Sequence, residues 1–151
     1  MAYLFQQLRL ALVVPVAAAA ITVVGAAQPT SSFAATPAYD PGLHAVSAML
    51  VSQDRAHVYA GYWLSYVLSV ASDEDVTASP TATVRDARYA RMAAAARRTT
   101  YVFDAGRSLD QQMTAWSQVH HAGRRVMVAN YAIWEFPTPM PLRTIPLDGD
   151  Y

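Results

Sequence analysis

An uncharged apolar stretch near the N-terminus constrains this chain more than any other feature. It runs from Leu10 to Ala27, 18 residues without a charged side chain. A helix of that length would be about 27 Å long, close to the ~30 Å hydrocarbon core of a bilayer. We therefore predict that residues 1–27 form a hydrophobic helix that spans a membrane.

Two other interpretations of this stretch stay open. A secretory signal peptide would use Arg9 as its positive region and end at Val24-Gly25-Ala26 or Gly25-Ala26-Ala27. A helix buried in a protein core would be equally apolar. Arg9 precedes the stretch, and the next Arg is Arg55. This asymmetry predicts a single span in the cell membrane with a cytoplasmic N-terminus and an extracytoplasmic remainder, or a secreted protein if the stretch is cleaved.

The charge and cysteine content exclude several classes of function. Eleven Arg and 11 acidic residues give a formal net charge of zero, whereas nucleic-acid-binding domains carry a basic surplus. The chain contains no Cys, so it forms no disulfide, no thiolate zinc site and no Cys nucleophile. We expect no nucleic-acid partner, no cofactor and no bound metal.

Composition divides the rest of the chain into three parts. Residues 28–41 are rich in Pro, Ser and Thr and predict an extended linker. Residues 42–136 alternate apolar segments with polar turns, which predicts one α/β domain. The tail of residues 137–151 carries four Pro and is expected to be extended or disordered.

The first half of the domain is predicted to be a helix followed by a pair of strands. Apolar residues at helical spacing indicate a helix over Leu43–Arg55. Leu64–Ala71 is rich in aromatic and β-branched residues and predicts a strand. The polar turn Ser72–Asp75 leads to a second short strand, Val76–Ser79, which we expect to pair with the first as a hairpin.

The second half is predicted to alternate helices and strands. A helix over Thr83–Arg98 precedes a buried strand over Thr99–Asp104. A second helix follows over Ser108–Val119, with Ser108 and Gln111 at the spacing of a capping box. Arg124–Phe136 reads as one long strand or as two with a turn near Asn130. The predicted inward face of the second helix consists of Leu109, Met113, Trp116 and Val119.

This order of elements predicts the fold class. Helices between short apolar strands are typical of an α/β fold with a small mixed or parallel sheet and flanking helices. In this chain the sheet would be preceded by the one N-terminal hydrophobic helix.

Arginines on the predicted Thr83–Arg98 helix are candidates for binding phosphate. Arg85, Arg88 and Arg91 follow one another at intervals of three, and Arg98 lies one heptad further on. Guanidinium groups bind phosphate through paired hydrogen bonds, which suits an anionic lipid head or a phosphorylated carrier. The alternative is a solvated helix face on which Asp86 pairs with one of the arginines.

Aromatic residues gather just before and at the start of the predicted strand pair. Amphipathic rings of this kind bind the faces of sugars, lie at membrane interfaces, or form the rim of an ordinary core. All three interpretations apply to Tyr59, Tyr62, Trp63 and Tyr66.

The remaining titratable residues give weaker signals. The acidic run Asp73, Glu74 and Asp75 has the oxygen ligands that a hard cation prefers, but it lacks EF-hand spacing, and a turn explains it. His44, His57, His120 and His121 lack the i, i+4 spacing of a helical metal site. No nucleophile elbow, P-loop or dinucleotide motif is present. A small hydrolase would need Asp73, Asp75, His57 and Tyr66 to converge within hydrogen-bond reach.

The stretch that contains these aromatic residues resembles part of a known family. The stretch Val58–Pro80 (VYAGYWLSYVLSVASDEDVTASP) resembles part of bacterial polytopic membrane glycosyltransferases of the lipid-phosphosugar-dependent mannosyltransferase type. The residues that carry it are Tyr59, Ala60, Tyr62, Trp63 and Tyr66, and it covers roughly residues 4–136. The resemblance implies that this is their C-terminal extracytoplasmic α/β domain, preceded by the last transmembrane helix. The catalytic acid of that family lies on an early loop that this chain lacks, so no catalytic residue carries over.

Together these observations predict a membrane-anchored extracytoplasmic domain that is accessory to, or derived from, an envelope glycosyltransferase and does not catalyse transfer alone. The expected partners are membrane lipid and, from the resemblance, a polyprenyl-phosphate-linked sugar or a separate membrane subunit. The alternatives are a secreted binding protein released from a signal peptide and the small hydrolase described above.

Overall fold

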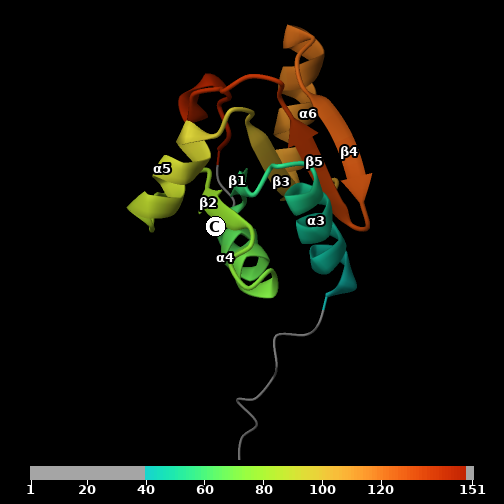
Figure 1. The fold of residues 1–151 in the computed structure, drawn as a ribbon. Coiled ribbons are helices and arrows are strands. Elements are labelled where there is room, and N and C mark those ends of the chain that lie inside the picture. The colour runs from blue at the N-terminus through green and yellow to red at the C-terminus, as the bar shows by residue number, and fades with distance from the viewer. Residues whose placement is uncertain (1–39, 149–151) are drawn as a thin grey trace, which may run out of the picture. The chain divides into compact units, whose positions relative to one another are not determined.

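Five strands form one mixed β-sheet in the computed structural model, which describes residues 40–148 (Figure 1). The order across the sheet is β2-β1-β3-β5-β4. The strands are β1 (His57–Ala60), β2 (Thr77–Pro80), β3 (Thr100–Asp104), β4 (Arg124–Val128) and β5 (Tyr131–Glu135). Strand β1 is parallel to both of its neighbours, whereas β5 is antiparallel to β3 and β4. The predicted hydrophobic helix of residues 1–27 and nearly all of the linker lie outside the described residues.

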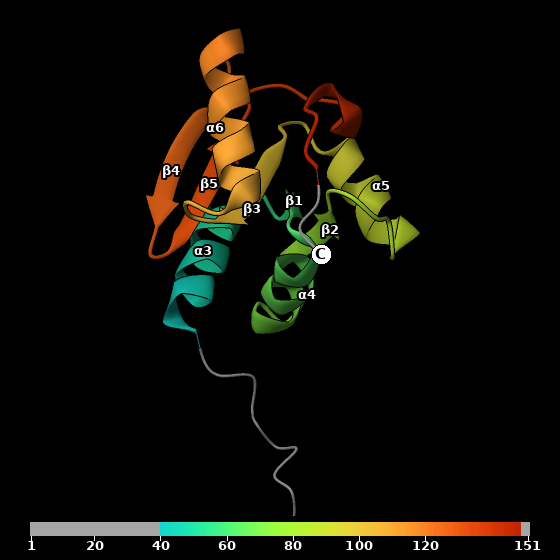
Figure 2. The ribbon, with the colours of Figure 1, turned by 180° about the vertical axis from the view of Figure 1, so that it is seen from behind.

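Helices cover both faces of the sheet (Figures 1 and 2). They are α3 (Pro41–Ser52), α4 (Tyr62–Ala71), α5 (Ala87–Ala95) and α6 (Ser108–His120), followed by a short 3₁₀ helix, η1 (Leu142–Thr144). Helices α3 and α4 pack on one face, and α5 and α6 pack on the other. The predicted fold class is therefore confirmed for the described part of the chain, because it is a mixed α/β fold with flanking helices.

The alternation of side chains along the strands builds two cores. In β3, Val102 points to the face covered by α3 and α4, while Tyr101 and Phe103 point to the face covered by α5 and α6. Because successive strand residues face opposite sides, the apolar residues Tyr101, Val102 and Phe103 bury both faces. This explains the continuous apolar run in the middle of TYVFD, which ends at Asp104, exposed at the end of the strand.

The predicted strand over Leu64–Ala71 is wrong, because this segment forms helix α4. Its buried residues, Leu64, Ser65, Leu68 and Ser69, recur at helical spacing. The two serines can be buried because each hydroxyl donates a hydrogen bond to a carbonyl of its own helix. Ser65 Oγ donates to the carbonyl of Tyr62, and Ser69 Oγ donates to that of Ser65. Aromatic and β-branched composition favoured a strand, but the period of burial decides for a helix.

The predicted hairpin is wrong for the same reason. Strand β2 is parallel to β1, with His57 beside Thr77 and Ala60 beside Pro80, and α4 is the crossover between them. The strand β1 itself was missed, because four residues before a glycine give little periodic signal. The polar turn after α4 is present, and Asp73 and Glu74 adopt positive φ there.

Helix α5 is shorter than predicted. It spans Ala87–Ala95 because Asp86 caps its start, accepting hydrogen bonds from the backbone N–H groups of Arg88 and Tyr89. Arg85 therefore precedes the helix, and Arg97 and Arg98 follow it.

Helix α6 agrees closely with its predicted range, but two details of the prediction are wrong. The predicted capping box is absent, since Gln111 bonds the carbonyl of Gly106 and Ser108 accepts from Gln112. On its predicted inward face, Leu109 and Met113 are buried, whereas Val119 is 74% exposed near the end of the helix. His121, in the left-handed conformation, ends the helix.

The final strands form a hairpin, and the tail packs on the sheet. Strands β4 and β5 are joined by a turn at Ala129 and Asn130, as the two-strand alternative predicted. Within residues 137–148 the tail joins no strand and is irregular apart from η1, but it is ordered against the domain. Ile145 is buried, and Met140, Leu142 and Leu147 pack against the core on the α5 and α6 face. Within residues 40–148, no helix has the length and apolar character needed to cross a bilayer.

Candidate ligand-binding site

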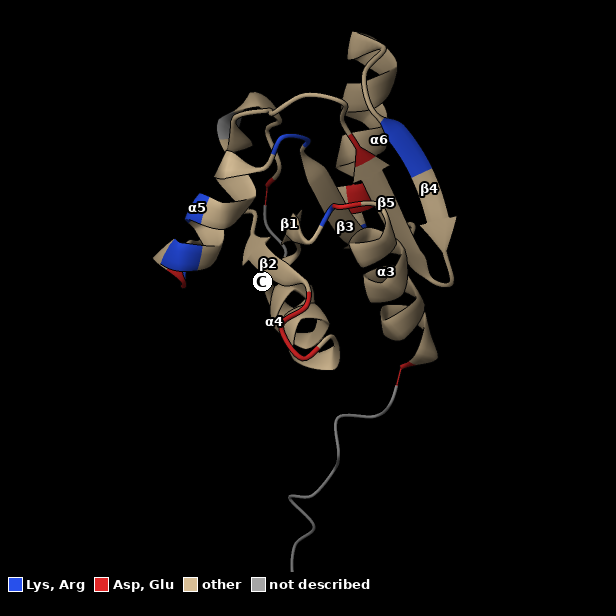
Figure 3. Ribbon diagram, in the orientation of Figure 1, with Lys and Arg blue, Asp and Glu red and all other residues tan. Residues whose placement is uncertain are grey.

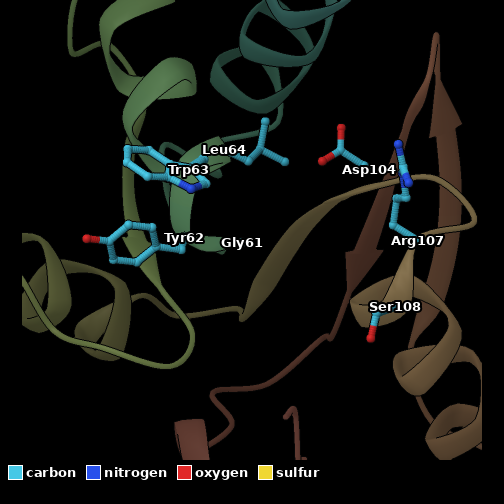
Figure 4. Close-up of a pocket in the computed structure, with 7 residues that line it drawn as sticks. All are labelled: Gly61, Tyr62, Trp63, Leu64, Asp104, Arg107 and Ser108. Atoms are coloured by element: carbon cyan, nitrogen blue, oxygen red, sulfur yellow. The ribbon is translucent and has the colours of Figure 1, made fainter. Parts of the chain in front are cut away.

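The connection of the strands creates a crevice at the carboxyl edge of the sheet. Strands β1 and β3 are parallel neighbours, yet the helix after β1 packs on one face and the helix after β3 on the other. Where neighbouring parallel strands send their helices to opposite faces, the two loops diverge and leave a space between them. A pocket of about 520 Å³ lies there, lined by Gly61, Tyr62, Trp63, Leu64, Asp104, Arg107 and Ser108 (Figure 4).

The two walls of this carboxyl-edge pocket differ in chemistry. One wall is the first turn of α4, with Leu64 pointing across the space toward Asp104 (Figure 4). The other wall ends β3 and begins α6, and it carries the carboxylate of Asp104, the guanidinium of Arg107 and the hydroxyl of Ser108. The pocket thus combines an apolar wall with a wall that can donate and accept hydrogen bonds.

Two helix N-termini line the pocket without a capping side chain. Helix α4 begins after Gly61 and α6 begins after Arg107, and neither has a side-chain hydrogen bond at its cap. Helices α3 and α5 are instead capped by the carboxylates of Asp40 and Asp86. The first N–H groups of α4 and α6 therefore depend on solvent or on a ligand for their hydrogen bonds.

Aromatic residues and one arginine cluster at α4, where Tyr62 and Trp63 line the carboxyl-edge pocket and Tyr66 and Arg85 line a neighbouring pocket. Tyr62 packs edge-on against Trp63 and Tyr66, with ring centroids 5.0 and 6.1 Å apart. The guanidinium of Arg85 lies 5.2 Å from the centroid of the Tyr62 ring and 5.1 Å from that of Tyr66. Trp63 is 66% exposed, so one face of an indole remains open to solvent at the rim. We call Tyr62, Trp63, Tyr66 and Arg85 the aromatic rim.

The structure thus joins two candidate groups that the sequence treats separately. Arg85 meets Tyr62 and Tyr66 because the loop after β2 returns toward α4, and a second pocket of about 260 Å³ lies beside them, lined in part by Glu74 and Tyr89.

The other candidates from these two groups lie elsewhere. Tyr59 is 3% exposed and stacks on Tyr101 in the core, so it does not belong to the rim. Arg88 and Arg91 are exposed on α5, and Arg98 lies beyond its end.

The residues of the hydrolase alternative are not brought together. Among the pockets of residues 40–148, Tyr66 lines the one beside Arg85, His57 lines one at the opposite edge of the sheet, and neither pocket includes Asp73 or Asp75. His44 lies on α3, and His120 stacks on Trp116 near the end of α6. In the same part of the chain, no group of three His or acidic residues has the geometry to hold a metal ion.

The polar wall is a site that sequence reasoning missed. Asp104 and Arg107 flank a short turn between a strong strand and a strong helix, and polar residues after a buried strand are a recognisable signal. The opposite wall, the first turn of α4 after β1, cannot be assigned to the same pocket from the sequence. That assignment requires knowing that β1 and β3 are neighbours, which is a property of the topology and not of any local pattern.

A buried carboxylate fixes the polar wall in place. Asp110 accepts hydrogen bonds from the Gly106 N–H at 2.8 Å, from Trp134 Nε1 at 2.8 Å, and from Arg125 Nη2 at 2.6 Å. Burial opposes ionisation of Asp110, but these hydrogen bonds outweigh it and hold its pKa below the ordinary value. The turn of Asp104–Arg107 is therefore tied through one side chain to β4 and β5.

The described chain enters the domain at the same edge. Asp40 Oδ2 accepts a 2.6 Å hydrogen bond from the hydroxyl of Tyr131, and Tyr131 pairs with Asp104 across the sheet. That hydrogen bond is the main reason why the pKa of Asp40 is lowered. The start of α3 and the carboxyl-edge pocket thus flank the same pair of strands.

No protein-family model, curated protein or solved structure matches this chain. The geometry of the site is therefore the basis for proposing a function.

Proposed function

We propose that residues 40–148 form a non-catalytic extracytoplasmic domain that binds the phosphosugar head of a lipid-linked saccharide, as an accessory to an envelope glycosyltransferase. The observation that carries the proposal is the carboxyl-edge pocket, which is lined by two uncapped helix N-termini, by Arg107 and by the exposed Trp63. The resemblance around Tyr59–Tyr66 supports the class of ligand.

The phosphate would lie against the polar wall. The N-terminus of a helix carries partial positive charge and unpaired N–H groups, both of which favour an anion. Arg107 adds a full positive charge and the paired donors that suit phosphate oxygens. Asp104 opposes a phosphate placed close to it, so we place the phosphate nearer to Ser108 and the start of α4.

The sugar would extend over the aromatic rim. An exposed indole offers a flat apolar surface to the C–H face of a pyranose ring, and Trp63 is the residue of the rim with the most open face. Arg85 holds the Tyr62 and Tyr66 rings from outside, so the rim is ordered before a ligand arrives, which reduces the entropy lost on binding.

The proposed connection to the membrane is the linker that precedes Asp40. If residues 1–27 span the cell membrane with the N-terminus in the cytoplasm, the linker leads to Asp40, whose partner Tyr131 pairs with Asp104 across the sheet. A linker of about 13 residues reaches at most about 45 Å when fully extended. An anchor of this kind would keep the domain close to a bilayer, so membrane lipid is the expected partner.

The test is a binding titration on the full chain kept in solution with a non-ionic detergent. Mannose 1-phosphate is added while tryptophan fluorescence and NMR shifts of residues 61–64 and 104–109 are followed. We expect saturable binding, with Trp63→Ala and Arg107→Gln each weakening it about tenfold.

Arg91→Gln is the matched control, because Arg91 is exposed on α5 and lines none of the described pockets. This variant should bind like the unmodified chain. Binding that is unaffected by both Trp63→Ala and Arg107→Gln, or lost equally in Arg91→Gln, would refute the proposed site.

A further inference from the structure

Another pocket, lined by several arginines, lies at the amino edge of the sheet. It has a volume of about 420 Å³ and is formed by the segment before β1 and the segment that joins α5 to β3. Figure 3 shows basic residues in both segments. The lining residues are Asp54, Arg55, Ala56, His57, Ala95, Ala96, Arg97 and Arg98. We call this the arginine pocket, and it shares no residue with the carboxyl-edge pocket.

Positive charge exceeds negative charge in the arginine pocket. Three guanidinium groups face one lining carboxylate, that of Asp54. Arg55 Nε also lies 3.9 Å from Glu135 Oε1, while Glu135 Oε2 accepts two hydrogen bonds from Arg124. Counting these neighbours, four guanidiniums share two carboxylates, so the region keeps a surplus of positive charge. Like charges held this close repel one another, and an anion would relieve that repulsion.

Two of the arginines are held in place by neutral acceptors. Arg55 Nη1 donates to Thr100 Oγ1 at 2.7 Å, and Arg98 Nη2 donates to the carbonyl of Gln53 at 2.8 Å. Neither bond neutralises the charge. The Arg55 side chain is only 8% exposed, and its Nε is buried without a hydrogen-bond partner. The positive charge of Arg55 is therefore fixed in position and incompletely satisfied, and its pKa is lowered by burial and by the charges of Arg98 and Arg124.

The C-terminal end of α5 offers a competing explanation for these charges. Cations near the last carbonyls of a helix are favourable, but the effect falls off within one turn and amounts to less than about 1 kcal/mol at exposed sites. One arginine would be enough for that role. Arg98 is directed to Gln53 in the loop after α3, and Arg55 is directed to β3, so neither is placed to act mainly on α5.

We propose that the arginine pocket binds a phosphate group, with Arg55 and Arg98 as the fixed donors and the exposed Arg97 as the group that closes on the bound anion. The ligand class is a phosphate monoester or inorganic phosphate. The site is independent of the proposed saccharide site, because it lies at the other edge of the sheet.

The experiment titrates inorganic phosphate into the full chain in non-ionic detergent and follows NMR shifts of residues 54–57 and 95–98. We expect saturable shifts of these residues that persist in Arg107→Gln, and a midpoint of thermal unfolding that rises with phosphate concentration. Arg97→Gln and Arg98→Gln should each weaken binding about tenfold. Arg55 is left unchanged because its burial makes a folding defect the expected result.

Two control variants separate this site from charge in general and from the saccharide site. Arg91→Gln removes one exposed charge of α5, and Arg107→Gln removes the charge of the carboxyl-edge pocket. Neither should change the response of residues 54–57 and 95–98. The proposal is overturned if phosphate leaves these residues unshifted, or if Arg91→Gln weakens binding as much as Arg97→Gln.

The source of the phosphate is distinguished by two further ligands. Glycerol 3-phosphate represents a free phosphate monoester, and short-chain phosphatidic acid below its micelle concentration represents a lipid head group. Equal affinity for the two means that only the phosphate is recognised, which supports the site as stated. Tighter binding of the phosphatidic acid assigns a lipid head group as the ligand, whereas short-chain phosphatidylcholine, a diester, should not bind.

Discussion

Asp110 is the residue whose charge contributes most to the order of the candidate site. It is 2% exposed, and its partners come from the turn before α6, from β4 and from β5. A buried carboxylate with three donors is stable only while all of them remain, because a lost partner leaves a desolvated polar group. The turn that presents Asp104 and Arg107 therefore depends on a residue that touches no ligand.

Replacement of Asp110 by Asn should lower the free energy of unfolding by about 3 kcal/mol, because Arg125 and Trp134 lose a charged acceptor. Chemical denaturation followed by circular dichroism measures this change. The matched control is Asp73→Asn, at an exposed turn position with positive φ that Asn also adopts. A loss of less than about 1 kcal/mol in Asp110→Asn would contradict the role given to the carboxylate.

The same residue predicts how stability changes in acid. The pKa of Asp110 in the folded protein lies below its ordinary value of 3.8, so folding favours the ionised form. This contribution is complete above that ordinary value and is lost as the pH falls through the lowered pKa. Asp40, held by Tyr131, has a shift of the same sign.

We therefore expect the free energy of unfolding to fall as the pH drops below about 4, and to fall less steeply in Asp110→Asn. Urea titrations at several pH values in this range test the difference in slope. Parallel pH profiles for the two proteins would show that Asp110 is not ionised preferentially in the folded state.

At the scale of elements, helix α4 shows why the sequence predicted some features and not others. Strand β3 and helix α6 were predicted well because each carries its own signal, an apolar run or a helical stripe. The register of α4 is set instead by contact with β2, where Ser69 Oγ accepts a hydrogen bond from the backbone N–H of Ala78. Local composition does not contain that contact.

The candidate site was predictable in part for the same reason. Tyr62, Trp63 and Tyr66 stand close together in the sequence and were recognised as a group. Their contact with Arg85 and their position near Asp104 depend on β1 lying between β2 and β3, and no pattern in a single sequence gives a strand order.

Ser69→Ala tests the coupling of α4 to the sheet. The substitution keeps helix propensity but leaves the buried Ala78 N–H without its acceptor, which costs about 1–3 kcal/mol. Ser52→Ala is the matched control, because Ser52 Oγ makes an exposed bond to the carbonyl of Met49 at the end of α3. Both are compared by thermal unfolding, and we expect a clear drop only for Ser69→Ala. Equal effects of the two substitutions would refute the coupling.

At the scale of the whole molecule, the proposals combine a binding domain with a membrane anchor. The domain has a neutral-to-polar pocket at one edge and a basic pocket at the other. Its own surface also carries exposed apolar residues on α4, with Val67 43% and Val70 66% exposed. These properties suit a domain that works next to a bilayer or beside a membrane subunit.

The anchor is tested by alkaline carbonate extraction of membranes from cells that express the full chain. We expect the protein to stay in the membrane pellet with its full mass. Ala18→Asp, which places a charge in the middle of the apolar stretch at roughly 2.5–3.5 kcal/mol, should move protein to the supernatant. Recovery of unmodified protein in the supernatant argues against a span, and a mass reduced by residues 1–26 or 1–27 identifies a signal peptide.

The bond between Asp40 and Tyr131 determines how a mechanical load on the start of the domain would be shared. It joins two residues that are 91 positions apart in the sequence, and it ends on β5, which pairs with both β3 and β4. A force applied at Asp40 would therefore be carried by two antiparallel ladders of backbone hydrogen bonds as well as by α3.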